Sequence, residues 1–152
     1  MTPDVNVLVA ASRTDHPHHA VALGWLNRAL ADCATGARFS VLPMVAAGTV
    51  RLVTHPRVFA SPTPTPDALA FVQAVLDAPG VEIPGLGDEW AAFVDLCQTH
   101  ALTGNTVPDA WIAAAVRDHH EHLVTFDRGF RRLLPQNRLT VLEPDSAAPD
   151  RG

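Results

Sequence analysis

Apolar residues recur along the chain at two spacings, one typical of helices and the other of short buried strands. Helical spacing of three and four residues marks four segments, which are 23–30, 66–76, 90–101 and 109–116. Short apolar runs lie between or beyond them, at 39–42, 81–83, 123–125 and 139–142. Strands that alternate with helices indicate a parallel sheet covered by helices on both faces. We therefore expect an α/β fold.

Two helical segments carry apolar faces with different expected roles. The stripe of Trp90, Phe93, Val94 and Cys97 is expected in the core. The face of 66–76 is broader than one buried face needs. Part of it fits a groove for a partner helix or a homodimer face, and ordinary packing is the alternative that the sequence leaves open.

The segment 5–11 fits two structures. Its β-branched residues favour a strand, but a buried helix suits the same apolar run equally well. The pattern alone leaves both open.

Composition describes a globular chain with few special demands. The 152 residues are 47% hydrophobic and 18% charged, which suits one domain, expected over 1–143, with a flexible tail over 144–152. No apolar run approaches the roughly 20 residues of a membrane span. No secretory signal is expected, because Asp4 stands where a basic n-region would lie. With only Cys33 and Cys97, a disulfide scaffold is excluded and a cytoplasmic location is expected.

Charge narrows the functional classes further. The net charge is −5, so binding of nucleic acid by bulk charge alone is not expected. All 11 basic residues are Arg. The absence of Lys excludes a Schiff-base enzyme and a Walker P-loop.

Three acids occupy places where ligands bind in α/β proteins. Asp4 precedes an apolar run, Asp109 heads a helix, and Asp127 follows the strand-like run 123–125 by two residues. Ligands of open sheets bind beyond the carboxyl ends of strands. Carboxylates that converge there repel one another unless a cation lies between them. Oxygen ligands favour Mg²⁺ or Mn²⁺, which can activate water and hold a phosphate oxygen for phosphodiester hydrolysis.

Each acid also has a purely structural interpretation. Asp109 completes a capping-box pattern that begins at Thr106, Asp127 can cap a short helix over 129–134, and Asp4 can be an ordinary terminal polar residue. Spacing alone leaves both interpretations open.

Three motifs follow one another along the chain, at Asp4–Val9, Gly104–Ala114 and Leu123–Phe130. In order and spacing they resemble those of PIN-domain ribonucleases, especially the VapC toxins abundant in mycobacteria. With the segment 48–59, the likeness covers nearly the whole chain.

The resemblance implies a three-layer α/β/α fold with a short, mostly parallel sheet, and a helix rather than a strand for 5–11. It also implies an endoribonuclease dependent on Mg²⁺ or Mn²⁺, which cleaves RNA and is silenced by a VapB-type antitoxin. By motif match, Asp4, Asp109 and Asp127 become catalytic metal ligands. Asn6 and Thr125 become supporting hydrogen-bonding residues.

One departure bears on activity. Many PIN domains carry a Glu on the helix after the second strand, but the corresponding segment 43–51 has no acid, with Ala47 and Gly48 at its middle. Water or another group would fill that place, and Glu82, Asp88 and Glu89 are the nearest acids in the chain. The alternative is a degenerate PIN module that binds RNA or protein without cleaving.

A phosphatase of the haloacid-dehalogenase type is a further rival. It also opens with an Asp after a strand, but it needs a second Asp two residues later, where this chain has Asn6. It also needs a Lys.

Arginines gather beside the third motif. Arg128, Arg131 and Arg132 are expected to contact RNA phosphates, and a solvated helix face is the alternative. The His clusters at 16–19 and 119–122 lack zinc-site spacing and are expected in solvated turns. No aromatic platform for base stacking is evident.

Overall fold

The computed structural model describes residues 1–144 of the chain. The helices are α1 (Val5–Ser12), α2 (His19–Ala34), α3 (Pro43–Val53), α4 (Thr65–Leu76), α5 (Trp90–Thr99) and α6 (Val107–Asp118). The strands are β1 (Thr2–Pro3), β2 (Phe39–Ser40), β3 (Val81–Glu82), β4 (Leu123–Thr125) and β5 (Leu139–Val141). Three short 3-10 helices are η1 (Gly104–Thr106), η2 (Arg128–Arg132) and η3 (Gln136–Arg138). Apart from Pro144, the expected tail lies outside the described residues.

Every strand pairing is parallel. One sheet has the order β1-β4-β5, and the other pairs β2 with β3. The backbone N–H of Ser40 donates to the Met1 carbonyl at 3.0 Å, which sets β2 beside β1. Along the chain, β2 and β3 are therefore added on one side of β1, and β4 and β5 are added later on its other side. In α/β proteins the crevice at such a reversal, beyond the carboxyl ends of the strands, is where ligands bind.

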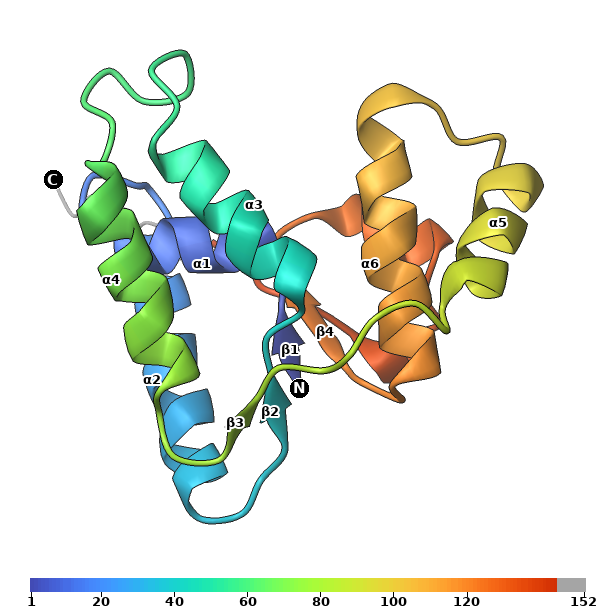
Figure 1. Ribbon diagram of the computed structural model, residues 1–152, viewed down its shortest axis with the longest axis horizontal. Helices are drawn as coiled ribbons and strands as arrows, with labels where there is room; N and C mark the ends of the chain where they lie inside the picture. Colours follow the sequence, from blue (N-terminus) through green and yellow to red (C-terminus); the bar gives the residue numbers. More distant parts are fainter. Residues whose placement is uncertain (145–152) are drawn as a thin grey trace, which may run out of the picture.

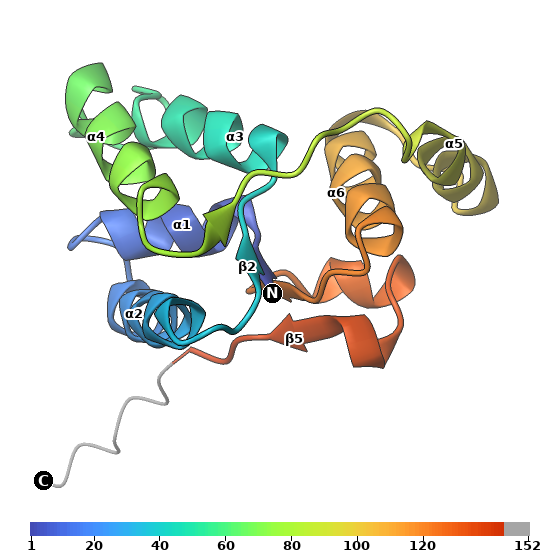
Figure 2. The same ribbon diagram turned by 60° about the horizontal axis from the view of Figure 1, so that its bottom comes forward.

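The helices divide into two groups around these strands. Figure 1 shows α1 to α4 on one side of the strands and α5 and α6 on the other. Figure 2 shows the same division after a 60° turn, with β5 running below α6. The expected α/β fold with a short parallel sheet is confirmed. In residues 1–144, no helix is both long and apolar enough to cross a membrane.

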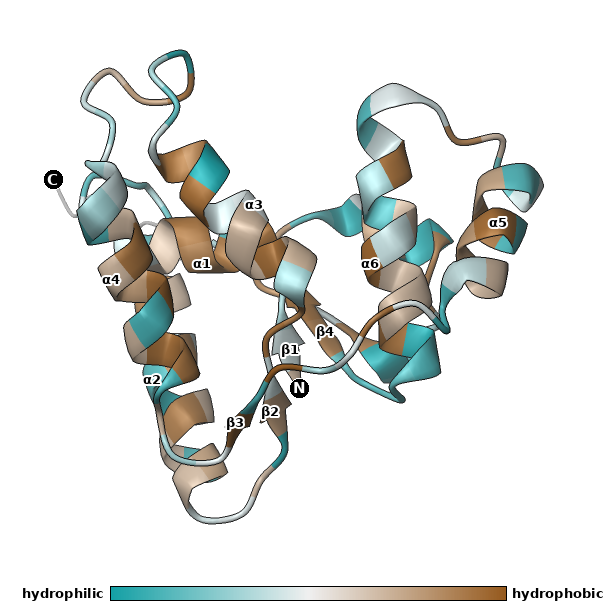
Figure 3. Ribbon diagram, in the orientation of Figure 1, coloured by the Kyte–Doolittle hydropathy of each residue, from teal (hydrophilic) through white to brown (hydrophobic). Residues whose placement is uncertain are grey.

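The ambiguous segment 5–11 is helical. Its residues from Val7 to Ala11 are all buried, and most of α1 is coloured as hydrophobic in Figure 3. The helix packs against α2, α3 and β4, so it has no polar face to mark its period. Burial on all sides explains why its pattern did not distinguish helix from strand.

The expected core stripe on 90–101 is present only in part, because Phe93 and Cys97 pack against the core whereas Trp90 does not. Leu96 is the one fully buried residue of α5, whereas Trp90 is 67% exposed and Phe93, Val94 and Cys97 are half-buried. In the described part of the chain, α6 is the only element that α5 contacts extensively. A single neighbouring helix covers only part of the apolar face, so Trp90 stays exposed and the rest of the stripe is half-buried.

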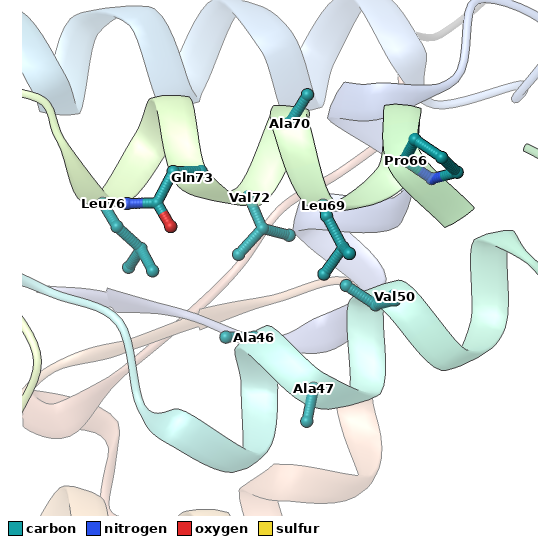
Figure 4. A pocket seen from close by; sticks show the side chains of 9 residues that line it. All are labelled: Ala46, Ala47, Val50, Pro66, Leu69, Ala70, Val72, Gln73 and Leu76. Carbon is teal, nitrogen blue, oxygen red and sulfur yellow. The ribbon is translucent and has the colours of Figure 1, made fainter. Parts of the chain in front are cut away.

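The broad apolar face of 66–76 lines a groove between α3 and α4. Figure 4 shows Leu69, Val72 and Leu76 of α4 pointing toward Ala46 and Val50 of α3. The groove has a volume of about 530 Å³, and Leu69 is 53% exposed. The predicted apolar groove is therefore present, and its use by a partner helix or in a homodimer stays a prediction.

Two leucines with opposite exposure test this description of the core. Leu8 of α1 is fully buried, whereas Leu69 of α4 lies on the open groove. We expect Leu8→Ala to lower the free energy of unfolding by about 3 kcal/mol, because it removes buried area and leaves a cavity. We expect Leu69→Ala to lower it by less than about 0.5 kcal/mol. Urea unfolding followed by circular dichroism measures both, and equal losses would contradict the fold.

Candidate functional site

Asp4 lies between the end of β1 and the start of α1. Its Oδ1 accepts a hydrogen bond from the backbone N–H of Val5 at 2.7 Å, so it caps α1. Only 5% of the residue is exposed. Burial raises the pKa of Asp4, and the charge of Asp127 adds to this, while hydrogen bonds from Thr125, Val5 and Asn6 act in the opposite direction. A carboxylate here is costly to keep ionised without a further positive partner.

Thr125 and Asn6 hold the other carboxylate oxygen of Asp4. The Thr125 hydroxyl donates to Asp4 Oδ2 at 2.7 Å, and Asn6 Nδ2 donates to the same oxygen at 2.9 Å. Asn6 Nδ2 also lies 3.0 Å from Thr125 Oγ1, and Asn6 Oδ1 accepts from the backbone N–H of Phe126 at 3.1 Å. Residues more than a hundred positions apart are thereby joined at the carboxyl ends of β1 and β4.

Asp127 ends the turn that follows β4. Its backbone N–H donates to Thr125 Oγ1 at 2.9 Å, and its Oδ1 accepts from the N–H of Gly129 at 2.7 Å. The expected cap on the short helix that follows is therefore present, although that helix is η2 rather than 129–134. Capping uses one carboxylate oxygen, and the exposed side chain still lines the cavity described below.

Asp109 is not the capping residue that its sequence pattern suggested. The capping box lies one turn earlier, where the Thr103 N–H donates to Thr106 Oγ1 at 3.2 Å and the Thr106 hydroxyl donates to the Thr103 carbonyl at 2.8 Å. Asp109 is the third residue of α6. Burial, then the charges of Asp4 and Asp127, raise its pKa to about 6. Among residues 1–144 no hydrogen-bond donor lies against its carboxylate.

The three aspartates line one cavity of about 1220 Å³. Asn6 lines it as well, and α3 contributes Ala47, Gly48 and Arg51. Across the described residues, no three His, Cys, Asp or Glu side chains are close enough to hold a metal ion between them as they stand. The aspartates thus share a space and repel one another without forming a closed cage. Their all-oxygen donor set suits a hard divalent cation that retains water ligands.

Glu89 and Trp111 were not chosen as site residues from the sequence, yet both line the same cavity. Trp111 Nε1 donates to Glu89 Oε1 at 2.7 Å, and the Gly87 N–H donates to Glu89 Oε2 at 2.7 Å. Burial acts to raise the pKa of Glu89, but the hydrogen bonds from Trp111 and Gly87 outweigh it and hold that pKa below its ordinary value. Glu89 is thus a buried, ionised carboxylate that fixes an indole ring.

No aromatic platform is evident from the sequence, yet the structure brings aromatic residues to the candidate site. Trp90, Phe93 and Trp111 all line the cavity that contains the aspartates. They come from α5 and α6, and which faces those helices present is decided by how they pack together. Helical spacing predicted Trp90 and Phe93 in the core, so the pattern gave no indication that they line a cavity.

The arginines beside the third motif lie outside the cavity lining. Arg128, Arg131 and Arg132 are exposed. Arg128 forms an ion pair with Glu143, with 3.0 Å between Nη2 and Oε2. Arg51, in contrast, supplies positive charge inside the cavity.

Comparison with known proteins gives a consistent family. The PIN-domain family profile matches residues 1–133. Ribonuclease VapC25 of Mycobacterium tuberculosis (strain ATCC 25618 / H37Rv) is 38% identical over 130 residues, which cover 85% of this chain and 89% of that protein. Ribonuclease VapC43 of the same strain is 40% identical over 131 residues, which cover 85% and 86%.

A solved structure supports the fold independently. The crystal structure of VapBC2 from Rickettsia felis bound to a DNA fragment from their promoter contains a chain similar to this one with a TM-score of 0.61. The match covers 93% of this chain and 98% of that chain at 18% sequence identity, which establishes a shared fold. With the family profile and the sequence relatives, it leads to one conclusion: this chain belongs to the PIN-domain family, within the group of VapC ribonucleases.

Proposed function

We propose that this protein is a metal-dependent endoribonuclease and the toxin of a VapBC-type toxin–antitoxin pair. One observation carries the proposal. Asp4, Asp109 and Asp127 come from three separate segments, line one cavity and include two carboxyl groups whose pKa is raised partly by their neighbours. Such mutual repulsion is relieved when a divalent cation binds.

Mg²⁺ or Mn²⁺ is the cation that this donor set favours. Mg²⁺ usually keeps several waters and uses one or two carboxylates together with substrate phosphates. An open set of aspartates, with no preformed three-ligand cage among the described residues, is consistent with that habit. When bound, such an ion would supply Lewis acidity at the phosphate and lower the pKa of water.

Each proposed residue has a separate task. Asp4 and Asp109 are the principal ligands, and Asp127 completes the set directly or through water. Thr125 and Asn6 are positioning residues, because their hydrogen bonds fix one oxygen of Asp4. RNA phosphates would meet Arg51 inside the cavity, with Arg128, Arg131 and Arg132 on the exposed surface of η2.

A non-catalytic RNA-binding module is the second candidate. It is favoured by the composition of α3, which lines the cavity with Ala47, Gly48 and Arg51 and contributes no carboxylate. Glu89 lies on the same cavity, but each of its oxygens already accepts a hydrogen bond. The two candidates share the fold and differ in whether bound RNA is cleaved.

An antitoxin is the proposed protein partner. The support is the similarity to a chain of the VapBC2 structure and to several VapC ribonucleases. The apolar groove between α3 and α4 is the proposed place for a partner helix or a homodimer contact.

Cleavage of RNA tests the catalytic assignment. We expect purified protein to cleave single-stranded RNA with Mg²⁺ or Mn²⁺ and to stop when EDTA is added. We expect Asp4→Asn to lower the cleavage rate at least about 100-fold, because one anionic ligand is lost. Asp67→Asn, on an exposed part of α4, should leave the rate unchanged. RNA that is bound tightly by wild-type protein and never cleaved would favour the non-catalytic module.

The pH dependence of stability tests the electrostatics of Asp109. Its folded-state pKa is raised from 3.8 to about 6, so the folded state binds a proton more tightly than the unfolded chain does. The contribution of Asp109 to the free energy of unfolding in EDTA should therefore fall as pH rises from about 4 to about 7. The free energy of unfolding of Asp109→Asn should be about 1–2 kcal/mol higher than that of wild type at pH 7.5, and the two should be equal near pH 3.5.

Asp67 is the matched control for this measurement. Like Asp109, it is the third residue of a helix and follows a proline, so both interact similarly with their helix dipoles. Asp67→Asn should therefore lose slightly in stability above pH 5. A clear loss of stability in Asp109→Asn at pH 7.5 would show that Asp109 supports its helix instead.

Salt dependence tests the arginines of η2. We expect Arg131→Glu combined with Arg132→Glu to weaken RNA binding and to reduce the slope of log affinity against log salt by roughly 1–2, since two phosphate contacts are lost. Arg28→Glu, on the exposed surface of α2, is the control. Unchanged affinity in the double variant would move the RNA path away from η2.

A further inference from the structure

Two exposed indole rings lie beside the candidate metal ligands. Trp90 is 67% exposed and Trp111 is 42% exposed, and both line the cavity that contains Asp4 and Asp109. Burying a large apolar side chain contributes about 1.5–3 kcal/mol to stability. Trp90 and Trp111, which are both exposed, do not contribute a substantial part of this stabilisation. Exposed apolar clusters of this kind mark surfaces that bind something.

The ring of Trp111 is held in place by a hydrogen bond that also uses its one polar group. Its single hydrogen-bond donor, Nε1–H, is used by Glu89 at 2.7 Å. Glu89 is itself 3% exposed and is tied to the Gly87 N–H. What Trp111 offers a ligand is therefore the apolar, electron-rich surface of an oriented ring.

Trp90 is supported in a comparable way. Its ring centroid lies 5.1 Å from that of Phe93, with 31° between the ring planes. Phe93 is half-buried, so it provides a backing for Trp90. The indole is thus partly ordered before any ligand arrives, which lowers the entropic cost of binding.

The rest of the cavity indicates the chemistry of the ligand. Arg51 supplies a guanidinium that suits a phosphate, and the aspartates suit a cation that itself binds phosphate. A ligand that presents flat rings and phosphates together is a nucleotide chain. The apolar groove between α3 and α4, with no charged residue among its described lining, offers a better match to a protein helix.

We propose that Trp90 and Trp111 form a stacking subsite for unpaired nucleobases next to the phosphate that the aspartates address. The proposal rests on the function proposed above and adds the surface that holds the bases. Aromatic faces accept any unpaired base, whereas bases in a duplex are already stacked and paired. The subsite therefore contributes affinity for single-stranded segments and loops of RNA.

The test uses full-length protein in EDTA, so that binding is measured without metal-dependent cleavage. The probe is an unstructured 12-nucleotide RNA, and the control probe is the same ribose-phosphate strand without bases. Trp90→Leu and Trp111→Leu remove the aromatic faces, whereas Trp90→Phe and Trp111→Phe retain a ring. Trp25→Phe is the control variant, since Trp25 is buried on α2 against Phe39. Circular dichroism and thermal unfolding confirm that each variant is folded.

We expect each Leu variant to bind the RNA about 5- to 100-fold more weakly, as loss of one stacked base implies. The Phe variants should stay within about threefold of wild type, and Trp25→Phe should be unchanged. Wild-type tryptophan fluorescence should be quenched by the RNA and not by the abasic strand. The salt dependence of binding should be the same in the Leu variants as in wild type, because no phosphate contact is removed.

The proposal is overturned if the Leu variants bind RNA as wild type does, or if the RNA and the abasic strand quench equally or not at all. It is also overturned if those variants bind RNA normally but fail to bind a co-expressed antitoxin, because the surface then belongs to a protein partner. A parallel assay of RNA cleavage with Mg²⁺ separates the two proposals. Base-dependent binding without cleavage would refute the proposed ribonuclease and support the stacking subsite. Cleavage by wild-type protein, together with unchanged RNA binding by the Leu variants, would support the ribonuclease and refute the subsite.

Discussion

The hydrogen bond from the Thr125 hydroxyl to Asp4 Oδ2 is the contact on which the site depends. It spans 2.7 Å between residues 121 positions apart. A hydroxyl has one donor and two acceptor positions, and Thr125 uses all of them, through Asp4, Asn6 and the N–H of Asp127. One saturated side chain therefore fixes the orientation of one candidate ligand, the start of α1 and the turn that carries another. Its loss would leave a buried carboxylate with fewer compensating donors, which is among the costliest defects in a folded protein.

The order of the strands makes this contact available. Parallel pairing of β1 with β4 brings the carboxyl ends of the first and fourth strands together, where the direction of building reverses. Asp4 and Asp127 then follow from their positions one and two residues beyond those strands. Asp109 reaches the same cavity from the first turn of α6, and α5 and α6 supply the aromatic residues. The cavity thus joins an acidic part, built on strand ends, to an aromatic part, built on a pair of helices.

The features that depend on local residue patterns could be predicted from the sequence. The features that depend on packing between distant segments could not. Alternating strands and helices, and acids just beyond strands, are local features, and the fold that they predicted is present. The segment 5–11 had no readable period because α1 is buried on all sides. The exposure of Trp90 depends on how little of α5 is covered by α6. The hydrogen bond between Glu89 and Trp111 joins residues 22 apart, with the whole of α5 between them. The pattern of hydrophobic residues predicts neither the exposure of Trp90 nor this hydrogen bond.

The attachment of α5 mainly through α6 makes the two parts of the cavity unequal in rigidity. Elements with few buried contacts open locally at a free energy well below that of global unfolding, and α5 has one fully buried side chain. Asp4, by contrast, is almost fully buried at the end of β1 and is tied by its hydrogen bonds to Thr125 on the buried strand β4. An RNA strand bound in the cavity would therefore contact a rigidly held carboxylate at Asp4 and a helix of lower local stability at α5.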